Sequence, residues 1–197
     1  MASEQDADPD ERREELIQLT KQILAAALAI EKNEKVLKTI TIALARLPKN
    51  ATVNGQPALV DLRKLDLSWA NATDAYWADV DFFSADFFRA NLAQTSFRRA
   101  DLTYTQFYHS NLTKAVLSKA ICAGTNFKFA DLRYADFTGA KINEQVNFEG
   151  AKVYGMKLPP ENALLIKDTE VDVSRNGDGS AMKSLSLWIK EGDNTDG

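Results

Sequence analysis

The middle of the chain repeats one apolar position every five residues. Taking every fifth residue from 62 to 142 gives 17 positions, and all 17 are apolar. Because 45% of the whole chain is apolar, chance would give such a run on the order of once in a million trials. We predict these positions to be core centres: Leu62, Leu67, Phe82, Phe87, Leu92, Phe97, Leu102, Phe107, Leu112, Leu117, Phe127, Leu132, Phe137 and Ile142, with Ala72, Trp77 and Cys122 completing the run.

Two further positions of the five-residue unit follow the same period. The residue two places before each centre is Ala, Ser or Thr in 14 of 17 units, and the residue directly before it is Asp or Asn in 11 of 17. A period of five fits neither a strand nor a helix, whose side chains repeat every ~2 and ~3.6 residues. It fits a chain that turns a corner every five residues. We expect the large and small residues to point inward, and Asp or Asn to accept hydrogen bonds from nearby backbone amides.

These units resemble the repeats of the pentapeptide-repeat family, written A(D/N)LXX. In this sequence they stand as Ala90-Asn91-Leu92, Ala100-Asp101-Leu102, Ala130-Asp131-Leu132 and Ala135-Asp136-Phe137. The resemblance implies a mainly β fold, a right-handed quadrilateral β-helix with four units in each 20-residue coil. Chains with helices before the repeat are abundant among cyanobacterial members, many without a known role. Some members inhibit DNA gyrase by imitating duplex DNA.

The five-residue period shifts once, near Gln145. The next centre would be Asn147, which is polar. The apolar series continues one place later, at Phe148, Val153 and Leu158. We therefore expect one inserted residue, as in a β-bulge. Pro159-Pro160 cannot donate ladder hydrogen bonds and should stop the coil, so the predicted β-helix spans residues 55–158 in about five coils.

Residues 1–54 have the pattern of an N-terminal helical cap. Asp8-Pro9-Asp10-Glu11 is typical of a helix start, and residues 1–8 before it are expected to be disordered. Apolar residues then recur at three- and four-residue steps over 16–30 and over 36–47. We expect two helices packed as a hairpin, with one long kinked helix as the alternative. They would cover the open end of the first coil, which would otherwise invite aggregation.

The C-terminal extension, residues 159–197, has the least regular pattern. Residues 163–173 and 185–189 fit short strands or a helix, and Asn176-Gly177-Asp178-Gly179 is a turn sequence. The polar tail from Glu191 to Gly197 is expected to be disordered.

Charge argues against mimicry of DNA. The whole chain carries a net charge of −4, but residues 58–86 carry −4 and residues 87–158 carry +5, so the repeat sums to +1. Imitation of a duplex needs a strongly negative rod, which this repeat lacks. The modest charge and the absence of a recognised motif also give no support for nucleic-acid binding.

The sequence contains few residues that could form a catalytic or metal-binding site. It contains a single cysteine and a single histidine, Cys122 and His109, so neither a disulfide within the chain nor a Cys/His zinc site is expected. Asp172-x-Ser174-x-Asn176-Gly177 begins like a calcium loop, but Lys183 occupies the twelfth position, where a bidentate Glu is needed. We predict no catalytic residue, cofactor, metal or small-molecule substrate, and no membrane span. A cytoplasmic, non-enzymatic protein is expected; an enzymatic site in the C-terminal extension is the alternative, and no residue supports it.

One side of the predicted coils gathers aromatic and basic residues just after the centres Leu67, Phe87, Phe107 and Phe127. These candidate partner-face residues are Trp69, Phe88, Arg89, Tyr108, His109, Lys128 and Phe129. Exposed aromatic residues with Arg are typical of binding hot spots. The alternative is that they stack into a surface ladder or lie under a flanking segment. We predict a protein-interaction or scaffolding module, monomeric or dimeric. The alternative function is a DNA-mimicking inhibitor or protector of gyrase or topoisomerase.

Overall fold

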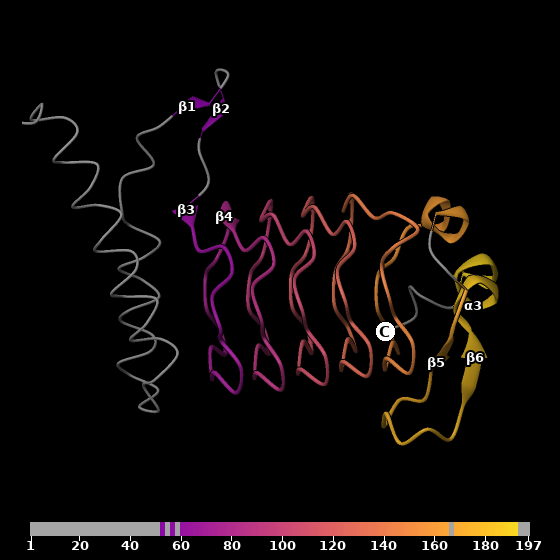
Figure 1. Ribbon diagram of the computed structural model, residues 1–197. Helices are drawn as coiled ribbons and strands as arrows, with labels where there is room; N and C mark the ends of the chain where they lie inside the picture. Colours follow the sequence, from indigo (N-terminus) through magenta and orange to yellow (C-terminus); the bar gives the residue numbers. More distant parts are fainter. Residues whose placement is uncertain (1–51, 54–55, 58–59, 166–167, 193–197) are drawn as a thin grey trace, which may run out of the picture.

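The computed structural model describes residues 52–53, 56–57, 60–165 and 168–192 (Figure 1). The expected N-terminal helices and the last five residues of the tail lie outside this part of the chain. Two short strands, β1 (Thr52–Val53) and β2 (Gln56–Pro57), pair antiparallel before the repeat begins. No helix in the described ranges is long and apolar enough to cross a membrane.

The repeat folds into a tower of stacked coils, a repeat β-helix (Figure 1). β3 (Val60–Asp61) pairs in parallel with β4 (Val80–Asp81), 20 residues later. The same spacing continues along the tower, as in the bridges between Asp66 and Asp86 and between Asn91 and Asn111. Each coil is therefore 20 residues long and is joined to the next by backbone hydrogen bonds.

From the unit of Leu62 to that of Phe137, each five-residue unit ends in a tight turn formed by the first and second residues after its centre. In the unit of Ile142 the turn lies one residue later, at residues 144–145. In the unit of Leu67, the second residue is Trp69, with a φ of 63°, and the N–H of Ala70 donates to the carbonyl of Leu67 at 3.1 Å. A positive φ at this position is what a type II turn requires. Asp or Asn before the centre supports the turn from its side chain: Asp86 Oδ1 accepts the N–H of Phe88 at 2.8 Å. This role of the carboxylates was predicted from the sequence.

The core is built from the predicted centres, which are buried from Leu62 to Leu158. Rings 20 residues apart stack face to face: Phe87 and Phe107 have centroids 5.1 Å apart, and Phe107 and Phe127 have centroids 5.3 Å apart. Phe148 continues this column, 5.2 Å from Phe127. Each such ring contributes roughly 1.5–3 kcal/mol by leaving water, as an upper estimate.

The predicted insertion is confirmed and lies between residues 141 and 147. Ile121 pairs with Lys141, a step of 20, whereas Asn126 pairs with Asn147, a step of 21. The side chain of Asn143 compensates for the disturbed backbone, because its Oδ1 accepts the N–H of Gly124 at 3.0 Å.

Pro159-Pro160 interrupt the coil but do not end the stack. The chain enters a 3-10 helix, η1 (Pro160–Leu164), and then returns to the tower in β5 (Glu170–Asp172). β5 adds another rung, since the N–H of Val153 donates to the carbonyl of Asp172 and the N–H of Asp172 donates to that of Ala151, both at 2.8 Å. The ladder therefore continues past the point at which the sequence predicted it to stop.

The C-terminal extension closes the last coil. β6 (Met182–Ser184) pairs antiparallel with β5, and α3 (Leu185–Glu191) follows it at the end of the tower (Figure 1). Leu185, Trp188 and Ile189 of α3 are buried in the same apolar core as the coils. Glu191, which we expected in a disordered tail, is the last residue of α3.

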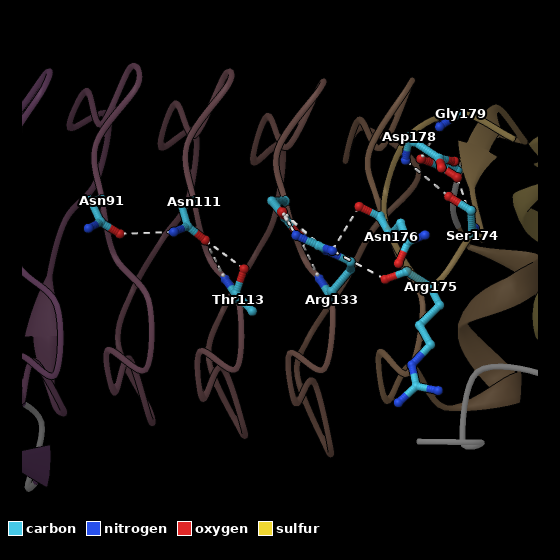
Figure 2. A network of polar contacts seen from close by, with 11 residues as sticks. Asn91, Asn111, Thr113, Arg133, Ser174, Arg175, Asn176, Asp178 and Gly179 are labelled. Carbon is cyan, nitrogen blue, oxygen red and sulfur yellow. Dashed lines mark hydrogen bonds and ion pairs between the residues drawn. The ribbon is translucent and has the colours of Figure 1, made fainter.

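Arg133 ties the loop between β5 and β6 to a coil of the tower (Figure 2). Arg133 donates to the backbone carbonyls of Arg175 at 3.2 Å and Asn176 at 3.0 Å. It also forms an ion pair with Asp131 at 2.6 Å, which raises the pKa of its guanidinium. At the end of β5, the carboxylate of Asp172 accepts two backbone N–H groups, from Ser174 and Gly179. The calcium-like sequence thus folds around hydrogen bonds to its own backbone.

Candidate functional site

The seven candidate residues form one continuous strip on the tower. We call it the aromatic–cationic strip: Trp69, Phe88, Arg89, Tyr108, His109, Lys128 and Phe129. All seven occupy turn positions, so the strip runs along a corner of the coils and not across a flat face. The side chains of Trp69 and Phe129 are 64% and 37% exposed. Arg89 and His109 are also exposed, whereas Phe88 and Tyr108 are half-buried.

At the N-terminal end of the strip, the side chain of Arg89 lies against two aromatic rings. The guanidinium carbon of Arg89 is 4.9 Å from the ring centroid of Trp69 and 5.2 Å from that of Phe88. The two rings meet edge to face, with centroids 5.8 Å apart. Cation–π contacts at such distances are favourable and limit the conformations that the arginine can adopt.

Toward the C-terminal end of the strip, four side chains continue the ring contacts from one coil to the next. The rings of Phe88 and Tyr108 are nearly parallel at 5.8 Å. Tyr108 touches the imidazole of His109 at 4.4 Å, and that imidazole stacks on Phe129 at 5.1 Å. The predicted alternative of a surface ladder is therefore present, and the ladder is exposed at several of its rungs.

The strip ends over a glycine. A Cβ at Gly150 would stand 2.3 Å from two ring carbons of Phe129, so the ring of Phe129 lies directly over this residue. The same arrangement occurs at two other corners, where Tyr104 lies over Gly124 and Tyr134 over Gly155. Sequence reasoning missed these glycines. The available signal was an aromatic residue followed by glycine at the same unit position one coil later.

The cations Lys128 and Arg89 of the strip differ in whether a carboxylate pairs with them. Lys128 Nζ lies 2.7 Å from a carboxylate oxygen of Glu149 and 5.1 Å from the ring centroid of Phe129. No carboxylate among the described residues forms an ion pair with Arg89. The nearby Asp66 and Asp86 direct an oxygen at backbone N–H groups of their own turns. Hydrogen bonds from the Ser68 hydroxyl and N–H hold the pKa of Asp66 below its usual value.

Cys122, which the sequence placed in the core, is fully buried there. Burial is the main cause that raises the pKa of its thiol, and the charge of Asp101 adds to it. A thiol in these surroundings stays protonated and unreactive, which fits a packing role.

The known proteins similar to this chain share its repeat. The family model for pentapeptide repeats matches residues 81–118 and 110–150, with eight copies. A pentapeptide repeat protein from the thylakoid lumen of Arabidopsis thaliana is 21% identical, with a TM-score of 0.55 over 66% of this chain and 87% of that chain. No curated protein matches the sequence.

Two further solved structures are similar over shorter stretches. HetL, a pentapeptide repeat protein involved in heterocyst differentiation regulation in the cyanobacterium Nostoc sp. strain PCC 7120, is 18% identical, with a TM-score of 0.29 over 58% of this chain and 72% of that chain. QnrB1, a plasmid-mediated fluoroquinolone resistance protein, is 21% identical, with a TM-score of 0.31 over 47% of this chain and 51% of that chain.

Proposed function

Because this chain belongs to the pentapeptide-repeat family, we propose that it is a non-enzymatic protein-interaction module that binds its partner through the aromatic–cationic strip. Fold alone does not give function, so the proposal depends on this one surface. Solenoids commonly bind partners along their length, where each repeat adds one more contact.

The observation that carries the proposal is the exposure of linked aromatic rings with an arginine among them. Trp69 is 64% exposed although it lies in ring contact with Phe88. In the described coils, the other corners bring at most two aromatic rings together, as Phe83 with Tyr104 and Tyr134 with Tyr154. A few hot-spot residues carry most of the binding energy of a protein interface, and Trp, Tyr and Arg are enriched among them.

We also propose a division of the chain that serves this role. Residues 1–54 act as a helical cap on the first coil, residues 55–158 form about five right-handed coils that carry the strip, and residues 159–197 cap the far end. Support for the last assignment comes from Trp188 and Ile189, which are buried in the core of the coils. Capped ends would keep the tower from associating end to end and leave its sides for partners.

The test compares partner capture by the wild-type chain and by a Phe88→Ser/Tyr108→Ser variant from lysate of the source cell. The matched control is Tyr76→Ser/Tyr104→Ser, because Tyr76 and Tyr104 are 54% and 46% exposed on other sides of the tower. We expect a partner that the wild type and the control retain and that the strip variant loses. Circular dichroism must first show that all three proteins are folded.

Two other outcomes would change the proposal. Loss of the partner by both variants would show that binding does not depend on the strip. Recovery of gyrase with the wild type would favour the alternative, a DNA-mimicking inhibitor or protector, despite the net charge of +1 on residues 58–158.

A further inference from the structure

Four backbone N–H groups of the strip are already used within the tower. The N–H groups of Trp69, Arg89, His109 and Phe129 donate to carbonyls of the following coil at 2.8, 3.1, 3.2 and 2.9 Å. Strand addition needs an edge with unpaired N–H and carbonyl groups. These four N–H groups are therefore not available to a partner strand, whereas the side chains of the same residues are exposed to one.

The chemistry of those side chains includes one unsatisfied cation. The guanidinium of Arg89 is held between Trp69 and Phe88, and no carboxylate of the described coils forms an ion pair with it. A guanidinium presents a rigid fork of donors that matches a carboxylate. Because two rings already restrict its motion, little conformational entropy remains to be lost when a carboxylate binds.

Arg89 lies at the boundary between two oppositely charged parts of the repeat. Residues 58–86 carry a net charge of −4, whereas residues 87–158 contain ten basic and five acidic residues, a net charge of +5. In the turns that carry Trp69 and Arg89, the carboxylate of Asp66 accepts the N–H of Ser68 and that of Asp86 accepts the N–H of Phe88. The positive charge of residues 87–158, on the C-terminal side of Arg89, increases the rate at which an acidic partner arrives there.

We propose that the partner of the strip is an acidic segment of another protein, with a carboxylate bound to Arg89 and apolar side chains packed on Trp69, Phe88 and Tyr108. This rests on the proposed function, and it adds the chemical class of the partner. Stacked coils are ~4.8 Å apart, so the three coil steps from Trp69 to Phe129 span about 14 Å. A segment of four to five extended residues covers that length, at ~3.3 Å per residue.

The test uses the full chain and a fluorescein-labelled peptide of alternating Glu and Leu as the probe, with a Lys and Leu peptide as its opposite. We expect fluorescence anisotropy to show binding of the acidic probe only, weakening severalfold as salt rises from about 20 to 300 mM. Arg89→Ala should weaken it about 30-fold, the usual effect at a hot spot. The control Arg98→Ala removes an exposed arginine from another corner and should change affinity less than twofold.

A charge exchange separates recognition from loss of folding. Arg89→Glu should lose the acidic probe and gain the Lys and Leu probe, a result that an unfolded protein would not give. Equal losses from Arg89→Ala and Arg98→Ala would overturn the proposal, because binding would then follow the general field. So would tighter binding of the acidic probe after deletion of residues 1–15, because the strip would then be occupied by the chain's own acidic segment.

The proposed function and the proposed chemistry of the partner can fail separately. If a cellular partner is lost with Phe88→Ser/Tyr108→Ser but kept with Arg89→Ala, the strip is an interaction surface and its partner is not acidic. If both variants keep the partner, the proposed function fails as well.

Discussion

At the scale of single residues, the stacked column of phenylalanine rings leaves no room for a charge. Phe107 is fully buried, with Phe87 and Phe127 stacked on its two faces at 5.1 and 5.3 Å. We expect Phe107→Asp to unfold the tower, because an unpaired carboxylate would be buried and neither neighbouring ring would have a partner to stack on. Phe107→Leu, which keeps an apolar side chain, should remain folded and lose about 1–2 kcal/mol. Circular dichroism and thermal melts measure both, and a folded Asp variant would show that the assigned register is wrong.

Glycine at the turn position has two separable roles, and the sequence provides a pair that distinguishes them. Gly150 and Gly139 share a positive φ, of 65° and 68°, but an added Cβ would meet Phe129 at 2.3 Å in the first case and only Lys119 at 3.6 Å in the second. Gly139→Ala should cost about 1 kcal/mol for its backbone conformation. Gly150→Ala should cost ~1–3 kcal/mol more, because a ring must move. Equal changes in the free energy of unfolding by urea would show that the ring gives way freely.

At the scale of elements, the side chain of Arg133 forms hydrogen bonds that hold the β5–β6 loop to the coils. Its guanidinium donates to the carbonyls of Arg175 and Asn176 (Figure 2). Arg133→Met keeps the length of the side chain but removes these donors, and should weaken the loop by about 1–2 kcal/mol. We expect the N–H of Asp172 to exchange with solvent roughly tenfold faster, by hydrogen-exchange NMR.

The matched control for this variant is Arg99→Met. Arg99 forms a comparable ion pair with Asp79 at 2.6 Å, but in a coil nearer the N-terminus. Its loss should leave the exchange of Asp172 unchanged. If both variants accelerated that exchange equally, Arg133 would act on the whole tower and not on the loop.

The start of α3 is anchored by a carboxylate, which makes the C-terminal extension sensitive to acid. The N–H of Ser186 and the hydroxyl of Ser184 donate to Asp168, and together they hold the pKa of Asp168 below its usual value although partial burial opposes them. A lowered pKa means that the stabilisation is complete above the unfolded pKa of ~3.9 and is lost as pH falls through the folded value. Asp168→Asn should therefore melt lower than the wild type at pH 6, and the difference between the two melting temperatures should shrink as pH falls below the unfolded pKa of Asp168. A difference that stays constant as the pH is lowered would mean that the ionised carboxylate is not the cause.

At the scale of the whole molecule, the sequence predicted the tower and its core because each centre recurs at a fixed step. The side of the tower that carries Trp69, Phe88 and Arg89 also followed from this period. Other features depend on contacts that a period does not encode. The position of Phe129 over Gly150 depends on the side-chain conformation of one residue, and the rung added by β5 depends on a chain that returns after two prolines. A short strand such as Glu170–Asp172 carries too little periodicity to be recognised before its neighbour in space is known.

The direction of the ladder hydrogen bonds determines how the tower responds to force. The bonds that join one coil to the next, such as the one from Leu67 to Asp86, run along the axis of the stack. A pull along that axis would load one row of these bonds at a time, so the coils would unfold one after another from an end of the tower. Each released coil would lengthen the chain by about 65 Å, from 20 residues at ~3.5 Å each less the ~4.8 Å already spanned. Force spectroscopy should therefore record a series of small, evenly sized extensions, and the tower would act as an extensible tether.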